Sequence, residues 1–343
     1  MLLLEYSFLE SDYFIRERVI FAVKKFFIMF TRRHIRIKVM QAVYALHKDP
    51  EQSLSSLQKN LQKQLHAAYE LYFVLYALLI AMHHKAKERF EIKKQQEHRE
   101  RTTIDKSPHF VQNRLLQFLS QHPLLEVQIQ KKRIKNWDLH FDYVDQLLEK
   151  MEVAPFYTHY AEAESHNWES DCRFVTSLYR EIIAPHDPLF DYLEDQNLGW
   201  ADDFSLVNTF IVKQLKKIQP GQNSSLQFPS PDDQKEEKDF GKELLKKTVS
   251  QREVLEKEIE GKTPNWESDR IAQLDLVLLQ LGISELLFFE NIPPKVTLNE
   301  YLEIAKDYST PKSNVFINGV LDKLVKEFTE TNRMKKSGRG LRE

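Results

Sequence analysis

The sequence predicts an all-α protein, on three observations. Glycine is scarce, at 8 residues in 343, whereas parallel sheets with phosphate loops and β-rich folds need glycine at their turns. Leucine, glutamate, lysine and glutamine are abundant. Apolar residues recur at helical spacing along most of the chain. We therefore expect helices near residues 31–48, 52–98, 108–121, 138–151, 169–184, 202–218, 238–259 and 266–290, then a short helix and a last one from about residue 313.

The overall charge and the cysteine content limit the functions that the chain can have. The formal net charge is −2, so any affinity for nucleic acid has to come from local patches of positive charge. Cys172 is the single cysteine, which rules out a disulfide within the chain. We therefore expect a cytoplasmic protein in a reducing compartment.

Two apolar segments resemble membrane elements. Residues 71–82, "LYFVLYALLIAM", are shorter than the roughly 20 residues that span a bilayer, and they continue a helical pattern. We expect a buried core helix there, and no membrane association. Residues 1–28 mix apolar and charged residues without a signal-peptide cleavage pattern. We expect translation to begin at Met29, with residues 1–28 a non-native extension or a loosely attached helix.

The segment 219–235, "QPGQNSSLQFPSPDDQK", has the composition of a linker. After it, residues 266–290 carry apolar residues on more than one face, as a central buried helix does. "TLNE" at 297–300 has the form of a capping box that begins the next helix. Gly319 within the last helix predicts close approach of a neighbouring helix. From residue 332 the tail is polar and basic, and we expect it to be disordered.

No motif for catalysis is present. The sequence contains no P-loop, no G-x-G-x-x-G after a strand, no H-E-x-x-H and no C-x-x-C. His159, Glu162, Glu164 and His166 form a small cluster, but without cysteine partners or a helical histidine pair it is a poor metal site. Cys172 shows no sign of activation and is expected in the core. We expect no enzyme activity, no metal and no cofactor.

The stretch 31–46, "TRRHIRIKVMQAVYAL", places positive charge where a helix disfavours it. Arg32, Arg33, Arg36 and Lys38 lie at the amino end, and no acidic residue occurs from residue 31 until Asp49. Each acidic residue that a helix start prefers contributes roughly 0.3–1 kcal/mol. The isolated helix is therefore slightly destabilised, and something has to compensate.

Two explanations are open for this basic helix. In the first, the cations form a face that is only solvated. In the second, phosphates supply the negative charge, and the guanidinium groups and the backbone N–H groups at the helix start bind them. Arg32 and Arg36 are four residues apart and share a face. Tyr44, further along, offers a ring on which a base of single-stranded RNA can stack.

The stretch "RRHIRIKVMQAVYAL" resembles the opening helix of the NusB transcription antitermination family. The run "LDLVLLQLGISELLFFENIPPKVTLNEYLEIAKDYSTPKSNVFINGVLDKLV" is more specific and is similar throughout to the last three helices of that family. "FGKELLKKTV", residues 240–249, resembles the start of its long third helix. The resemblance covers about 18 residues at the amino end of the chain and about 90 residues at its carboxyl end.

This resemblance implies an RNA-binding factor without enzyme activity. The family pairs with a small-subunit ribosomal protein, NusE, binds the boxA element of nascent rRNA, and helps the transcription elongation complex pass terminators. Carried over by position, the resemblance implies RNA contacts by Arg32, Arg33, Arg36, Tyr44, Tyr308, Lys312 and Phe316. Tyr308 and Phe316 bracket the turn before the last helix, and Lys312 lies in it. Packing alone is an open alternative for Phe316. His34 stands where the family often has a further basic residue.

The predicted architecture is a NusB-like helical bundle enlarged by a helical insertion. The segments are an extension (1–28), the first NusB-like helix (29–48), the insertion (49–218), a linker (219–235), the NusB-like bundle (236–330) and a basic tail (331–343). The insertion either enlarges the bundle or forms a docking surface for a further partner.

Two other functions stay open. One is a relative of the RNA-binding domain of rRNA cytosine methyltransferases, which needs a glycine-rich cofactor domain after it. The sequence contains no such domain. The other is a helical protein-interaction scaffold whose basic helix is only solvated surface. RNA titration discriminates among them.

Overall fold

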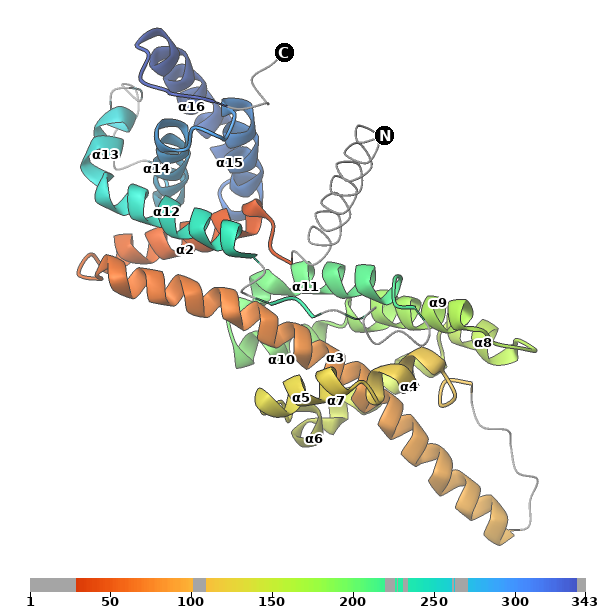
Figure 1. Cartoon of the computed structure of the whole chain (residues 1–343). Helices are drawn as coiled ribbons and strands as arrows, with labels where there is room; N and C mark the ends of the chain where they lie inside the picture. The colour runs from red at the N-terminus through yellow and green to blue at the C-terminus, as the bar shows by residue number, and fades with distance from the viewer. Residues whose placement is uncertain are drawn as a thin grey trace, which may run out of the picture. The chain divides into compact units, whose positions relative to one another are not determined.

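The computed structural model describes residues 29–100, 109–219, 226, 228–230, 234–260, 262 and 271–337. Within these ranges all regular structure is helical and no strand occurs, which confirms the predicted class (Figure 1). The chain forms two compact units. We call Phe30–Leu65 with Pro231–Glu343 the terminal unit, and His66–Ser230 with Met29 the middle unit. The predicted extension, residues 1–28, lies outside the described residues.

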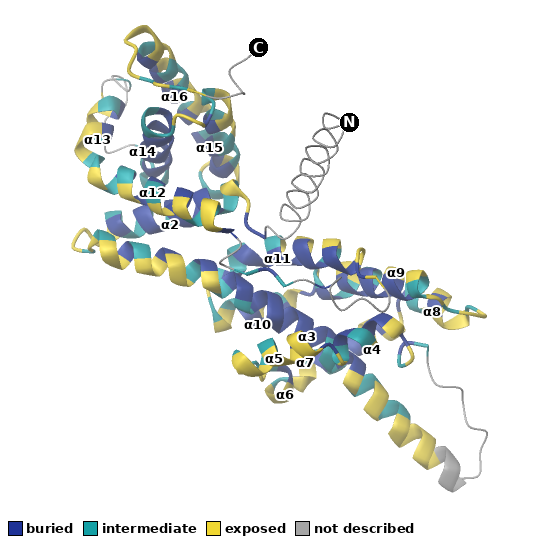
Figure 2. Cartoon of the chain, in the orientation of Figure 1, coloured by how far each residue is buried: buried dark blue, intermediate teal, exposed yellow. Residues whose placement is uncertain are grey.

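The terminal unit is built around one buried helix. Its elements are α2 (Arg32–Lys48), the first turns of α3 (Leu54–Glu100), α12 (Lys235–Ser250), α13 (Arg252–Glu260), α14 (Gln273–Phe288), α15 (Pro294–Tyr308) and α16 (Ser313–Glu330). The other five complete helices all pack against α14, which is buried from Val277 to Leu286 (Figure 2). The predicted central helix is thus confirmed from residue 273 onward. Residues 266–270 of that prediction lie outside the described ranges.

Two helix boundaries differ from the prediction. The helix expected over 238–259 is interrupted, since α12 ends at Ser250 and α13 begins at Arg252. Helix α15 begins at Pro294, so the predicted capping box lies inside the helix and was wrong. Proline at a first helical position has the required φ, and it lacks only an N–H that would stay unbonded there. Thr297 donates instead to Oε1 of Glu285, over 2.7 Å.

The glycine that marks close helix packing is Gly241 of α12, and not Gly319. A Cβ added at Gly241 would lie 2.6 Å from Cγ2 of Ile35 on α2, whereas one added at Gly319 meets nothing within 4 Å. The prediction for Gly319 was therefore wrong. Helices α2 and α12 pack so closely because this position has no side chain.

We expect opposite effects of alanine at these two glycines. Gly241→Ala should lower the free energy of unfolding by about 1–3 kcal/mol, because the added methyl overlaps Ile35. Gly319→Ala should raise it by up to about 1 kcal/mol, because alanine loses less backbone entropy in a helix. Urea unfolding followed by circular dichroism measures both. Equal effects of the two substitutions would contradict the packing described.

The middle unit surrounds the apolar centre of α3. Its further elements are α4 (Arg114–Ser120), α5 (Pro123–Lys131), α6 (Asn136–Leu139), α7 (Phe141–Glu152), α8 (Pro155–Glu162), α9 (Trp168–Leu178), the π-helix η1 (Tyr179–Ile183), α10 (Asp187–Gln196) and α11 (Gly199–Leu215). Helices α5, α8 and α10 were not predicted. Each has a proline in its first turn, which ends a helical pattern in the sequence but suits a helix start.

Residues 71–82 of α3 form the core of the middle unit, as predicted. This helix is long and apolar enough to cross a membrane, but 78% of its most apolar window is buried inside the protein. Tyr72 and Tyr76 are fully buried there and donate to Oε1 of Gln214, over 2.7 and 3.2 Å. Cys172 of α9 is buried as expected, and burial raises the pKa of its thiol to about 12.

Parts of the predicted linker and tail are anchored. Phe228 lies in the middle unit with its ring centroid 5.5 Å from those of Phe73 and His122. In the tail, Nζ of Lys336 donates to the carbonyls of Glu285 (3.1 Å) and Phe289 (2.8 Å) at the end of α14. The prediction of a disordered tail was therefore wrong up to residue 337, because an ammonium satisfies carbonyl groups that the helix end leaves open.

Candidate nucleic-acid interface

The start of α2 is an uncapped helix end. Its first turn has no acidic residue, and Thr31 at the N-cap position makes no side-chain cap hydrogen bond. The Thr31 hydroxyl lies 2.7 Å from Nδ1 of His34 instead. Backbone N–H groups at such an end lack partners within the helix and carry partial positive charge. The local backbone therefore favours an anion.

Arg36 does not face solvent. Only 2% of its side chain is exposed, and Nε and Nη2 donate to the two carboxylate oxygens of Glu285 over 2.8 Å each. Glu285 also accepts from Thr297 (2.7 Å) and Tyr301 (3.3 Å). Burial opposes the charge on Arg36, but the hydrogen bonds and charge of Glu285 outweigh it and raise the pKa of the guanidinium. The sequence-based assignment of Arg36 to phosphate is corrected: this buried cation anchors α2 to α14.

Arg33 and Arg32 are the cations that face outward. Arg33 pairs with both oxygens of Glu300 on α15, over 3.0 and 2.9 Å, yet keeps 40% of its side chain exposed. Arg32 is exposed, with Cζ 5.3 Å from the ring centroid of Phe240, and no ion pair involves it among the residues described. The cations at the start of α2 are thus partly compensated by carboxylates of the terminal unit itself.

A surface cleft of about 520 Å³ opens at this point. It lies between the start of α2 and the turn from α14 to α15, and is lined by Thr31, Arg32, Arg33, His34, Arg36, Asn291, Ile292, Pro293, Val296 and Glu300. Arg32 and Arg33 are the exposed cations along it. The cleft therefore combines an uncapped helix end with two guanidinium groups, which is a favourable setting for a phosphate.

His34 adds no charge to this cleft near neutral pH. Burial, followed by the positive charges of Lys38 and Arg33, lowers the pKa of His34 to about 4. The ring therefore stays neutral. The positive charge on the exposed side of the cleft therefore comes from Arg32 and Arg33.

This pKa shift predicts a loss of stability in acid. Since the unfolded chain has its His34 pKa near 6.5, it binds a proton between pH 6.5 and 4 that the folded chain excludes. The stabilising contribution is complete above pH 6.5 and is lost as the pH falls toward 4. When the pH is lowered from 7.5 to 4.5, the urea midpoint of unfolding should fall less for His34→Gln than for the parent chain. Parallel losses in the two proteins would show that His34 does not titrate in this window.

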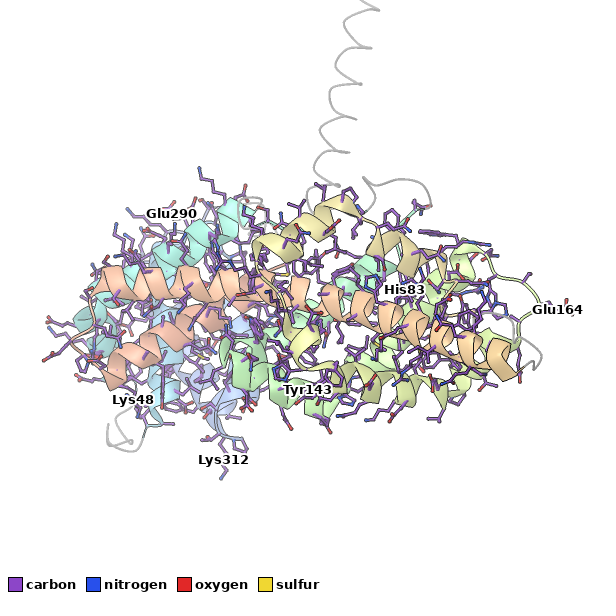
Figure 3. The ribbon with its side chains drawn as sticks, turned by 90° about the horizontal axis from the view of Figure 1, so that it is seen from below. Lys48, His83, Tyr143, Glu164, Glu290 and Lys312 are labelled. Carbon is purple, nitrogen blue, oxygen red and sulfur yellow. The ribbon has the colours of Figure 1, made fainter. Side chains whose placement is uncertain are left out.

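The turn between α15 and α16 has its own anchor. Asp275 is 5% exposed, and its carboxylate accepts hydrogen bonds from the hydroxyls of Ser309 (2.6 Å) and Ser313 (2.7 Å). The turn is therefore held to the start of α14. Tyr308 and Phe316 flank it and are half-buried, while Lys312 is exposed and projects from it (Figure 3).

The structure therefore brings the candidate residues together in two groups. Arg33 and Arg36 are held by Glu300 and Glu285, Arg32 lies beside them on α2, and the turn is held by Asp275. Glu285 and Asp275 are ten residues apart on α14, roughly 15 Å at 1.5 Å per residue. Tyr44 is half-buried on α2, roughly 18 Å along the helix from Arg32 by the same rise, with Nζ of Lys48 5.4 Å from its ring centroid.

Sequence reasoning missed the carboxylates that hold both groups. Asp275 and Glu285 lie in an otherwise apolar helix, and a buried carboxylate needs a hydrogen-bonding or cationic partner. That signal was present in the sequence, but it did not identify the partners. Glu300 was assigned to a capping box, which hid its pairing with Arg33.

Comparison with known proteins gives a consistent set of relatives. A family model described as the NusB family matches residues 209–326. Transcription antitermination protein NusB of Salinibacter ruber is 44% identical over 104 residues, which are 30% of this chain and 65% of that protein. NusB of Chloroherpeton thalassium is 39% identical over 104 residues, 30% and 49% of the two chains. NusB of Methylacidiphilum infernorum is 44% identical over 98 residues, 29% and 68%.

The chain thus spans about two thirds of the Salinibacter ruber protein and about half of the Chloroherpeton thalassium protein. Among solved structures, T. maritima NusB is similar, with 25% identity over 43% of this chain and 90% of that chain and a TM-score of 0.27. The family of this chain is therefore assigned from the sequence relatives and not from the structural similarity.

Proposed function

Because this chain belongs to the NusB family of transcription antitermination proteins, we propose that it is an RNA-binding antitermination factor acting on boxA-type RNA of rRNA operons. It works in the cytoplasm with the small-subunit ribosomal protein NusE, as part of a transcription elongation complex, and catalyses no reaction. The observation that carries this proposal is the uncapped start of α2, where Arg32 and Arg33 line a cleft.

The proposal gives the residues of the cleft distinct roles. Arg32 and the remaining N–H groups of Arg33 bind phosphates of the RNA backbone. Glu300 holds the guanidinium of Arg33 in one orientation. Arg36 acts through its bond to Glu285, which keeps the start of α2 against α14. Rigid support of this kind lowers the entropy lost when RNA binds.

Base contacts are proposed for the second group and for Tyr44. Tyr308 and Phe316 each present part of a ring beside the α15–α16 turn, and Lys312 adds an exposed ammonium. An unpaired base gains roughly 1–3 kcal/mol by stacking on an aromatic side chain. Since Asp275 fixes the turn through Ser309 and Ser313, the rings have a defined position for such stacking.

Fluorescence titration tests the function. A labelled boxA-type RNA and a scrambled RNA of equal length are titrated with the full chain, with and without NusE. We expect preference for boxA-type RNA and tighter binding when NusE is present. Equal affinity for the two RNAs with no effect of NusE would favour a helical protein-interaction scaffold.

A further inference from the structure

Gly319 of α16 has no packing role in the part of the chain that the structure describes. It lies inside the helix, and a Cβ added there meets nothing within 4 Å. Glycine is nevertheless the least favourable residue after proline in a helix interior, because it loses the most backbone entropy. A locally unfavourable residue that no internal contact requires is typical of a functional site.

Gly319 shares one side of α16 with an aromatic residue and two cations. Lys312, Phe316, Gly319 and Lys323 follow the spacing i, i+4, i+7 and i+11, which places them on a single helix face. We call these four residues the α16 face. Both lysines are exposed and Phe316 is half-buried, and Lys312 projects from the turn at one end (Figure 3). The face is roughly 16 Å long at 1.5 Å per residue.

The glycine keeps the surface beside Phe316 open. Side chains on a helix lean toward its amino end, over the residues three and four positions earlier. A side chain at position 319 would therefore lie over Phe316 and Val315. Val315 is 72% exposed, so this part of the helix is uncovered. With glycine at 319, an approaching molecule can reach both the exposed part of the Phe316 ring and the helix backbone one turn further on.

Lys323 adds a positive charge that no carboxylate of the described residues neutralises. The acidic residues nearest to it along α16 are already paired: Asp322 with Lys326 over 2.8 Å, and Glu327 with Lys262. The lysine at the other end of the α16 face likewise makes no ion pair within the described ranges. The face therefore combines an accessible ring, an open stretch of backbone and two ammonium groups that can bind an anion.

We propose that the α16 face carries single-stranded RNA onward from the α15–α16 turn: a base packs beside Phe316, the strand crosses the backbone at Gly319, and Lys323 binds a phosphate. Proteins bind single strands by joining aromatic stacking surfaces to positive charge that follows the backbone. RNA is favoured over a protein partner because a strand has both flat bases and regularly spaced phosphates, which match the ring and the two lysines. The inference rests on the proposed function and extends its RNA surface.

Gly319→Leu should make the full chain more stable and a poorer RNA binder. Leucine is a good helix former and its Cβ meets nothing within 4 Å, so the urea midpoint should rise. The same side chain covers Phe316, so affinity for labelled boxA-type RNA should fall about tenfold in a fluorescence titration. Asn318→Leu is the matched control, since Asn318 is exposed one position away and off the α16 face. Its RNA affinity should stay unchanged.

Lys323→Ala should weaken the same RNA about fivefold at low salt, and it should lower the slope of log affinity against log salt by about 0.7. Lys246→Ala is the control for the lost charge. Lys246 is an exposed lysine of α12 that makes no ion pair within the described ranges, and its replacement should leave affinity and slope unchanged.

Three outcomes would overturn the inference. If replacing Arg32 and Arg33 weakens RNA binding while Gly319→Leu and Lys323→Ala do not, RNA does not follow the α16 face, but the proposed function stands. If the two α16 variants weaken binding of NusE and leave RNA binding by the chain alone unchanged, the face is a protein-docking surface. If the parent chain binds no RNA with or without NusE, the proposed function fails as well. Lys323 is exposed, so its variant stays informative if Gly319→Leu fails to fold.

Discussion

Arg36→Met should lower the free energy of unfolding of the terminal unit by about 3–5 kcal/mol, because it leaves the buried carboxylate of Glu285 without its cation. Arg36 is 2% exposed and Glu285 is 0% exposed, so water cannot replace the lost partner. Two 2.8 Å hydrogen bonds disappear together. Urea unfolding followed by circular dichroism measures the effect.

A double variant separates loss of the pair from loss of packing. Arg36→Met with Glu285→Met should recover much of the stability, because two apolar side chains replace a buried ion pair at little cost. Recovery stays incomplete, since Thr297 and Tyr301 lose their acceptor. Arg252→Met is the control: Arg252 is 39% exposed and pairs with Glu256, and an exposed pair contributes at most about 1 kcal/mol. Equal losses for Arg36→Met and Arg252→Met would contradict the assigned anchor.

Replacing Arg32 and Arg33 together by alanine should weaken RNA binding by roughly tenfold or more at low salt. A hydrogen bond to a charged group contributes roughly 1.5–3 kcal/mol, and about 1.4 kcal/mol corresponds to tenfold in affinity. The salt dependence should also flatten. Removing two phosphate contacts to single-stranded RNA lowers the slope of log affinity against log salt by about 1.4. Fluorescence titration at several salt concentrations gives both quantities.

Arg252→Ala is the matched control for this experiment. Its exposure, 39%, is close to the 40% of Arg33, and it too is paired with a glutamate in the terminal unit. It changes the net charge at a different place. Arg252→Ala removes one positive charge and the double variant removes two. If Arg252→Ala lowers the RNA affinity and the salt slope by half as much as the double variant does, RNA is attracted by positive charge in general, and the cleft has no special role. A salt slope that the double variant leaves unchanged would exclude the two arginines as phosphate ligands.

The arginines of α2 show which features of the site could be predicted from the sequence and which could not. It correctly identified a helix start with unusual positive charge, and the structure confirms the helix and its missing acidic residues. It treated three arginines alike. The structure distinguishes them by burial, and burial depends on carboxylates 249 and 264 residues away in the chain. No local pattern contains that information.

Periodicity and composition alone determined the helical class, the buried centre of α3 and the central place of α14, because these follow from the local spacing of apolar residues. Family motifs in the sequence indicated the NusB relatives. Only the tertiary structure decided which cations face solvent, which glycine lies against a neighbouring helix, and which tail lysine caps α14. Each of these depends on contacts between segments distant in sequence, where the geometry of packing sets exposure and hydrogen bonding.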